Sequence, residues 1–280
     1  MNDELLIRIA NAPGVPGFET EVQTIIAKEL SECCDEVQAD HMGNVIGIKR
    51  ATIKPENGKR PVRLMLAAHC DEPAMMLKHV NDKGFIHFIH CGGVSPVIMQ
   101  SQRVVIHGKE KIRGVIAPSF KKDGEKTELD DLLIDTGMPK DWVTERVSPG
   151  DPITVDEGTS ILNGKVWVGR NFDNRIGSYT MVEAMRQVGD TPVDVYAVST
   201  VQEEVGLRGA RASAFGVAPD IGIAIDGSMA RQAYGSDKGN LCEPGQGTGI
   251  YIRDNLTIGH PKLVKYIFEL CEKRGIAHQG

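Results

Sequence analysis

The stretch VYAVSTVQEEVGLRGA, residues 195–210, joins an apolar run to two adjacent acids and a glycine-rich turn. The apolar run predicts a buried strand, and Gly206 and Gly209 predict a turn after it. Glu203 and Glu204 are therefore expected just beyond the carboxyl end of a strand, which is the edge where open α/β sheets bind ligands. Adjacent carboxylates repel each other, so the pair is either solvated on a loop or neutralised by a cation.

Two further apolar runs, residues 63–68 and 221–225, predict strands that also end in ligand-type side chains. His69 follows the first run and Asp226 follows the second. Asp173 precedes a helical pattern of apolar residues, where a carboxylate can cap the helix. Each residue alone is explained as a structural histidine, a turn residue or a cap.

Taken together, these positions predict one site, because parallel strands deliver their carboxyl ends to the same edge of a sheet. One histidine with several carboxylates suits zinc, cobalt or manganese, and a nearby carboxylate can orient the imidazole. The chemistry predicted is hydrolysis by a water activated between two divalent metal ions. The predicted site residues are His69, Asp71, Asp173, Glu203, Glu204 and Asp226.

Residues 74–165 have a different pattern, with short alternating segments between turn residues. The segments predict strands at 85–89, 103–107, 112–116, 132–135 and 152–155. We interpret this stretch as a β-rich domain inserted between two parts of an α/β domain, residues 1–73 and 166–280. The predicted α/β sheet is mixed, mostly parallel and flanked by helices. The polar segment 54–60 predicts a hairpin between its neighbouring strands.

Composition narrows the class of protein. The chain has 280 residues, 41% of them hydrophobic, and no apolar run long enough to cross a membrane. A net charge of −6 argues against broad nucleic-acid binding. The six cysteines form no CxxC pair, which favours reduced thiols. The acidic N-terminus lacks the features of a secretory signal, so we expect a cytoplasmic protein.

Five segments resemble, in order over essentially the whole chain, motifs of the cocatalytic metallo-aminopeptidases. That group includes the tetrahedral (TET) and glutamyl aminopeptidases and proteins once labelled endoglucanase M. The segments are APGVPGFETEV (12–22), AAHCDE (67–72), VGRNFDNRIG (168–177), VQEEVGLRGA (201–210) and AIDGS (224–228). The resemblance implies an α/β catalytic domain interrupted by a barrel-like dimerisation domain, and assembly into dimers and larger shells such as dodecamers. It also implies release of the N-terminal amino acid from short peptides, with two zinc or cobalt ions per subunit, or manganese.

The resemblance also implies a role for each site residue. Asp173 would bridge the two ions, and His69 and Asp226 would complete one ion's ligands. Glu204 would bind the second ion and Glu203 would be the general base. Asp71 would orient His69.

The sequence departs from the family pattern at two places. Family members continue past the GIAHQ stretch, residues 275–279, to a final histidine ligand, whereas this sequence ends at Gly280. We therefore expect either a fragment or an incomplete second metal site, with His260 and His278 as the nearby substitutes. Residues 227–239 lack the family spacing after the Asp ligand.

Two alternatives to an active aminopeptidase stay open at this point. The first is a catalytically impaired member that keeps the fold and assembly surface without the second metal site. The second is a glycan hydrolase using two carboxylates. The low aromatic content, 5%, offers few platforms for sugars and disfavours this second alternative.

Overall fold

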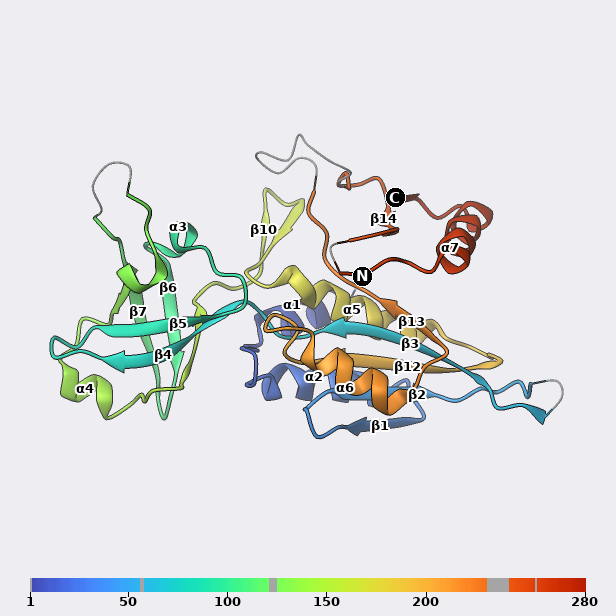
Figure 1. Cartoon of the computed structure of the whole chain (residues 1–280), viewed down its shortest axis with the longest axis horizontal. Coiled ribbons are helices and arrows are strands. Elements are labelled where there is room, and N and C mark those ends of the chain that lie inside the picture. The colour runs from blue at the N-terminus through green and yellow to red at the C-terminus, as the bar shows by residue number, and fades with distance from the viewer. Residues whose placement is uncertain (1, 56–57, 121–124, 231–241, 255) are drawn as a thin grey trace. The chain divides into compact units, whose positions relative to one another are not determined.

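Figure 1 shows a computed structural model of the chain, which describes residues 2–55, 58–120, 125–230, 242–254 and 256–280. The chain divides into two compact units, Met1–Asp226 and Gly227–Gly280. Across the described ranges, none of the helices combines the length and apolarity needed to cross a membrane.

The α/β part of the first unit is built on a mixed sheet. Among the described residues its strand order is β1 (Glu36–Ala39), β2 (Val45–Lys49), β12 (Val193–Thr200), β3 (Val62–His69) and β13 (Ile221–Ala224). β3 pairs in parallel with β12 and β13, whereas the pairings β1–β2 and β2–β12 are antiparallel. The predicted mixed sheet is confirmed. The predicted hairpin across residues 54–60 is wrong, because β12 lies between β2 and β3.

Helices cover both faces of this sheet. Helices α1 (Asp3–Asn11), α2 (Thr20–Ser31) and α5 (Phe172–Gln187) share one apolar core with the face that carries Val195 and Ala197 of β12. Helix α6 (Arg208–Val217) packs on the opposite face, with Tyr196 and Val198. The alternation along β12 thus divides its side chains between two apolar cores, as expected for a strand buried on both faces.

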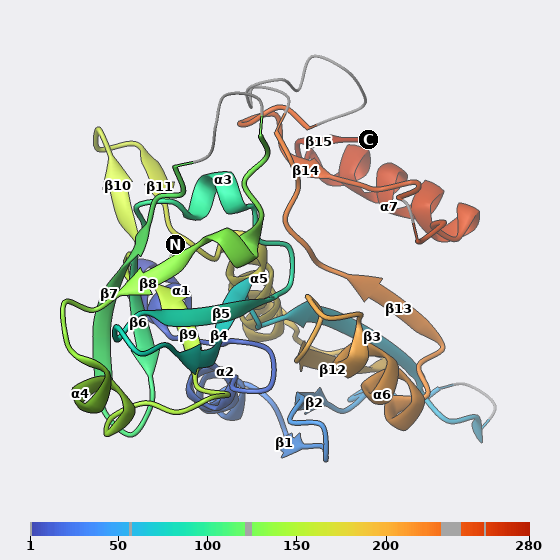
Figure 2. The same ribbon diagram turned by 60° about the vertical axis from the view of Figure 1, so that its left-hand side comes forward.

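The β-rich part of the first unit is a closed barrel, seen at the left in Figure 2. Its strands, in barrel order, are β4 (Ala74–Val80), β5 (Ile86–Cys91), β8 (Leu133–Asp135), β7 (Lys111–Ala117), β6 (Arg103–His107) and β9 (Pro152–Val155). Short helices accompany them in the described residues, namely α3 (Pro96–Met99), a 3-10 turn (Leu129–Asp131) and α4 (Lys140–Thr144). The predicted barrel-like fold is confirmed, and the five predicted strands correspond to β5 to β9. The exact domain boundaries at residues 73/74 and 165/166 stay a prediction.

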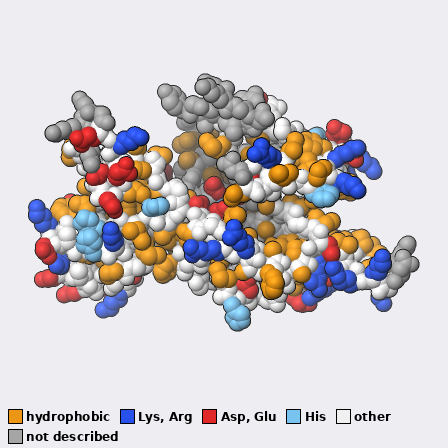
Figure 3. All heavy atoms as spheres, in the orientation of Figure 1, with side chains coloured by type: hydrophobic (Ala, Val, Ile, Leu, Met, Phe, Trp, Pro, Cys, Tyr) orange, Lys and Arg blue, Asp and Glu red, His pale blue; other side chains and the backbone are white. Residues whose placement is uncertain are grey.

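A hairpin of β10 (Ser160–Leu162) and β11 (Val166–Val168) follows the barrel and leads into α5. On the barrel side, at the left of Figure 3, acidic and basic side chains are interspersed rather than gathered by sign.

The second unit contains helix α7 (Pro261–Arg274) and a parallel pair of short strands, β14 (Thr248–Gly249) and β15 (His278–Gln279). Helix α7 ends at Gly275, whose φ of 65° lies in the left-handed region that glycine adopts readily. Of the segment 227–239 that departs from the family spacing, residues 231–239 lie outside the described residues.

Candidate active site

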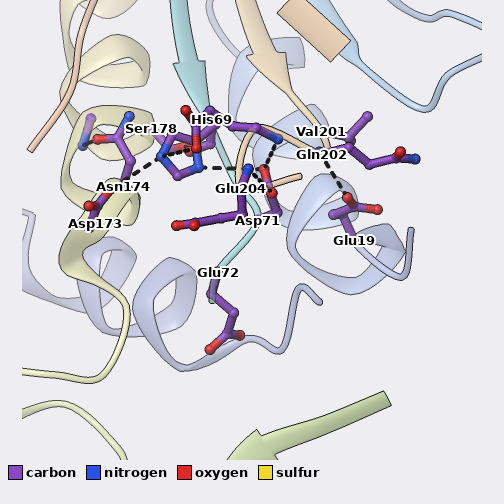
Figure 4. Close-up of polar contacts among 12 residues, drawn as sticks. Glu19, His69, Asp71, Glu72, Asp173, Asn174, Ser178, Val201, Gln202 and Glu204 are labelled. Carbon is purple, nitrogen blue, oxygen red and sulfur yellow. Dashed lines mark hydrogen bonds and ion pairs between the residues drawn. The ribbon is translucent and has the colours of Figure 1, made fainter. Parts of the chain in front are cut away.

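The ends of three neighbouring strands converge at the candidate site, shown in Figure 4. His69 is the last residue of β3, and Thr200, the last residue of β12, pairs with it. Glu203 and Glu204 follow the end of β12 and therefore lie just beyond the level of His69. β13 runs parallel on the other side of β3 and places Asp226 at the same edge. The edge of the sheet brings these residues together as the strand pattern predicted.

The imidazole of His69 lies at the centre of a group of carboxylates. Its Nε2 lies 3.2 Å from Oδ1 of Asp173, 3.8 Å from Oε2 of Glu203 and 3.8 Å from Oδ1 of Asp226. Potential ligand atoms of His69, Asp173 and Glu204 all lie within 4.8 Å of one another. The imidazole is buried, whereas Asp173 and Asp226 are half or more exposed. A ligand can therefore reach a buried nitrogen from the solvent side.

The start of helix α5 is shaped so that Asp173 reaches this group. Asp173 and Asn174 have non-helical backbone angles inside the helix. The side-chain amide of Asn174 donates to the carbonyl of Ile225 at 2.8 Å, and its oxygen accepts from the backbone N–H of Gly177 at 3.0 Å. A Cβ on Gly177 would lie 2.1 Å from that oxygen. Asn174 thus ties the segment that carries Asp173 to the strand end that carries Asp226.

The excess of negative charge changes the protonation of the site. Burial lowers the pKa of His69, but the carboxylates of Asp173 and Asp71 raise it more, to about 10. The hydrogen bond with His69 lowers the pKa of Asp173. Burial raises the pKa of Glu204 to about 7, with His69 opposing this shift and Glu203 adding to it. Burial also raises the pKa of Glu203. Without a metal ion, the site therefore holds protons that a cation would displace.

Asp71 holds the backbone of the two glutamates as well as facing His69. Its Oδ1 and Oδ2 accept the backbone N–H groups of Glu203 and Glu204, both at 3.0 Å. Its Oδ1 also lies 3.4 Å from Nδ1 of His69, without hydrogen-bond geometry. Asp71 is fully buried. One carboxylate therefore contacts both the histidine and the loop that carries the acids.

Two buried residues that the sequence analysis did not single out also hold this loop. The side-chain oxygen of Asn44 accepts the N–H of Val201 at 3.0 Å, and Oε1 of Glu19 accepts the N–H of Gln202 at 3.1 Å. The only sequence signal for Glu19 is its place inside the APGVPGFETEV segment. Asn44 lies in the turn before β2 and carries no such signal.

A second charged cluster begins at Glu72, the residue after Asp71. Its carboxylate is buried and pairs with Arg170 at 2.8 Å and with the fully buried Arg175 at 3.4 Å. It also accepts the backbone N–H of Gly14 at 3.0 Å. This cluster fixes the 12–17 turn beside the site.

The predicted substitutes for a final histidine ligand lie in the second unit. Nδ1 of His278 lies 2.8 Å from the carbonyl oxygen of Ile276, and its ring contacts Phe268 edge-on. His260 precedes helix α7. A ligand role for either histidine stays a prediction.

Comparison with known proteins identifies the family. The chain matches the sequence profile of the M42 glutamyl aminopeptidase family over residues 43–280. It belongs to that family. Members of the M42 family are hydrolases that act on peptide bonds, so the predicted enzyme class is confirmed.

Individual M42 relatives are similar along nearly all of the chain. The lysyl aminopeptidase of Pyrococcus furiosus is 32% identical over 290 residues, which cover 99% of this chain and 80% of that protein. A solved aminopeptidase from the archaeon Desulfurococcus kamchatkensis has a TM-score of 0.90 at 32% identity, covering 99% of this chain and 78% of that one. The TET1 peptidase of Pyrococcus horikoshii has a TM-score of 0.83 at 29% identity, and the match covers 99% of this chain and 83% of that one.

Proposed function

We propose that this chain is a metal-dependent aminopeptidase that releases N-terminal amino acids from short peptides by means of a water activated between two divalent ions. The observation that carries the proposal is the group of His69, Asp173 and Glu204, whose ligand atoms lie within 4.8 Å, in a member of a peptidase family. Three further acids, Asp226, Glu203 and Asp71, lie around the same imidazole.

The chemistry of these residues fits divalent metal ions. One imidazole nitrogen with several carboxylate oxygens is a donor set for zinc, cobalt or manganese. Burial and repulsion from neighbouring carboxylates raise the pKa of Glu203 and of Glu204, and this cost is removed when cations neutralise the carboxylates. In the proposed assignment Asp173 would serve both ions, His69 and Asp226 would hold one of them, and Glu204 would hold the other.

In the proposed reaction, Glu203 is the general base. When bound, the divalent ions lower the pKa of a water molecule and polarise the carbonyl of the scissile bond. Glu203 would accept a proton from the attacking water as the water oxygen bonds to the scissile carbonyl carbon, and would deliver that proton to the amine nitrogen as the C–N bond breaks. Burial raises its pKa, which makes its carboxylate a stronger proton acceptor than an exposed glutamate. Asp71 holds the Glu203 amide and faces the imidazole of His69, so it orients both.

Assembly and selectivity are also part of the proposal. The TET1 peptidase of P. horikoshii can assemble into a tetrahedron or a large octahedral shell, which supports a homo-oligomer here, with a dimer as the building block. The names of the family and of the P. furiosus relative specify different N-terminal residues, glutamyl and lysyl, so they favour neither for this chain. A cytoplasmic location stays a prediction.

The test is to measure metal content per chain and hydrolysis of amino-acid anilides on the same preparation, before and after addition of zinc or cobalt. The expected result is two ions per chain and metal-dependent turnover, removed by a chelator and restored by metal. A chain that holds one ion at saturation and gives no turnover would favour the catalytically impaired alternative. A panel of anilides, acidic, basic and apolar, would define the preferred N-terminal residue.

A further inference from the structure

The loop that carries the two glutamates is held through four consecutive backbone N–H groups. The N–H of Val201 donates to Asn44, that of Gln202 to Glu19, and those of the next two residues to Asp71. All four acceptors are side-chain oxygens of buried residues that lie outside the loop. The loop is therefore positioned by partners far away in sequence rather than by its own turn hydrogen bonds alone.

The arrangement of these N–H groups depends on the backbone conformation of Gln202. Its φ is 54°, in the left-handed region, which costs energy for a residue with a side chain. This left-handed residue turns the chain so that the following two N–H groups point at the carboxylate of Asp71. A contact that holds Gln202 in this conformation therefore also sets the direction of Glu203.

Glu19 supplies that contact. It is 5% exposed, and no arginine or lysine in the described part of the chain pairs with it, which is rare for a glutamate so deeply buried. It precedes helix α2, yet among the described residues its side chain accepts no capping hydrogen bond from that helix. Its Oε1 instead accepts the N–H of Gly17 at 2.8 Å and the N–H of Gln202 at 3.1 Å. The buried charge thus bridges the 12–17 turn and the glutamate loop.

Helix α2, which Glu19 precedes, is itself held in place beside the glutamate loop. One turn along the helix, the side-chain amide of Gln23 donates to the carbonyls of Ser199 in β12 and Gly43, both at 3.0 Å. The helix is therefore tied to the strand that precedes the loop, and a side chain at its start has little freedom to follow a displaced loop.

We infer that Glu19 is a positioning residue for catalysis: it holds Gln202 in the left-handed conformation and thereby directs the Glu203 carboxylate toward the site. This inference rests on the proposed function. Among the described residues, no hydrogen bond or ion pair joins the Glu19 side chain to a predicted metal ligand, since its bonds go to Gly17 and Gln202. Its loss should therefore change how well the base is placed and not how many ions are bound.

The test begins with Glu19→Ala in the metal-loaded protein. We expect kcat for an amino-acid anilide to fall about 10- to 100-fold, as for a displaced catalytic group, with KM and metal content near wild type. Glu19→Gln retains an oxygen at the same reach and should restore most of kcat. Glu19→Asp keeps the charge but loses the reach, so it should resemble Glu19→Ala. If Glu19→Ala does not fold, the kcat values of Glu19→Gln and Glu19→Asp alone test the inference.

The matched control is Glu29→Ala, which removes an equally buried glutamate of helix α2 that pairs with Arg8 and Arg186. It should lower the melting temperature without lowering kcat. An active Glu19→Asp with an inactive Glu19→Gln would overturn the inference, because charge would then matter and not reach. An unchanged kcat in folded, metal-loaded Glu19→Ala would overturn it as well.

Amide hydrogen exchange separates this inference from the proposed function. In Glu19→Ala, the amides of residues 202–204 should exchange faster than in wild type, and in Glu29→Ala they should not. This readout holds even for a wild-type chain that cleaves no anilide, which would count against the proposed function alone. Unchanged exchange at residues 202–204 in Glu19→Ala would overturn the inference.

Discussion

Asp71 and Glu72 are neighbours in sequence, both buried, and yet they belong to two clusters with opposite charge balance. Around Glu72 the protein supplies its own cations, since Arg170 and Arg175 both pair with this one carboxylate. Around Asp71 the imidazole of His69 faces several acids. Among the residues that the structure describes, the first cluster is balanced in charge, whereas the second has more anionic than cationic groups.

The difference shows how to separate structural acids from functional ones. A buried charge is tolerated when it is paired and hydrogen-bonded. Where the chain supplies the partner, removing the acid should damage folding. Where the chain leaves the charge to a metal ion, removing the acid should damage binding or chemistry. Each of the following predictions tests this distinction.

The largest effect is expected from Glu203→Gln in the acidic cluster. An amide of the same shape cannot accept the proton from water, so kcat should fall by about 10²–10⁴-fold, the usual contribution of a general base. The variant should keep its metal content and melting temperature. The measurement is the rate of anilide hydrolysis by metal-loaded protein. Activity within threefold of wild type would show that another residue is the base, whereas loss of both ions would make Glu203 a ligand.

The next largest effect is expected from Glu72→Ala in the balanced cluster. This change leaves Arg175, which is 0% exposed, without its carboxylate. Breaking a buried pair in this way costs about 3–5 kcal/mol of the free energy of unfolding. Urea unfolding of the metal-loaded protein measures the loss.

Glu29→Ala is the matched control for Glu72→Ala. Glu29 is about as buried, but the side chains of Arg8 and Arg186 are 39% and 26% exposed and can be hydrated when it is removed. Glu29→Ala should therefore lose clearly less free energy of unfolding than Glu72→Ala. Equal losses in the two variants would contradict the distinction between the clusters.

The two clusters also differ in how far the sequence predicts them. The acidic side chains at strand ends and the order of the motifs predicted which residues gather around His69. The strand order was harder to predict from the sequence. Strand β12 lies between β2 and β3 in the sheet, although it begins more than a hundred residues after β3 ends. The loop contacts of Asn44 and Glu19 join residues 157 and 183 positions apart. No local pattern encodes such contacts, which depend on the pairing of β2 with β12 and on the hydrogen bond by which Gln23 of α2 holds Ser199 of β12.

A smaller effect is expected from pH, through protons that compete with metal. In the metal-free protein the pKa of His69 is raised to about 10, so its imidazolium stabilises the fold below pH 6.5 and this stabilisation is lost as pH rises through 10. A metal ion needs the neutral imidazole. Metal affinity should therefore rise with pH, by about tenfold or 1.4 kcal/mol per unit between pH 7 and 9, because one proton is displaced.

Calorimetric titration with metal at several pH values measures this dependence, and buffers of different ionisation enthalpy count the proton released. Below pH 7 the slope should steepen, because the pKa of Glu204 is raised to about 7 and this group then also loses a proton on binding. His69→Gln should bind metal weakly and without the slope between pH 7 and 9. A wild-type affinity that is constant over this range would contradict the prediction.

The smallest effect is expected where the barrel touches the acidic cluster. Gly92 follows strand β5 with φ of 86°, and a Cβ there would lie 2.7 Å from Oε2 and 2.9 Å from Cβ of Glu204. Gly92→Ala should push the Glu204 side chain out of its rotamer at a cost of about 0.5–1.5 kcal/mol. If Glu204 is a metal ligand, this lowers metal affinity by about two- to tenfold. Gly137→Ala is the matched control, since this barrel glycine also has a positive φ, 70°, but a Cβ there meets no described atom within 4 Å. Titration of both variants with zinc decides whether the barrel helps to place a ligand. Equal affinities would mean that Glu204 moves freely or binds no ion, and would leave the acidic cluster positioned by the sheet edge alone.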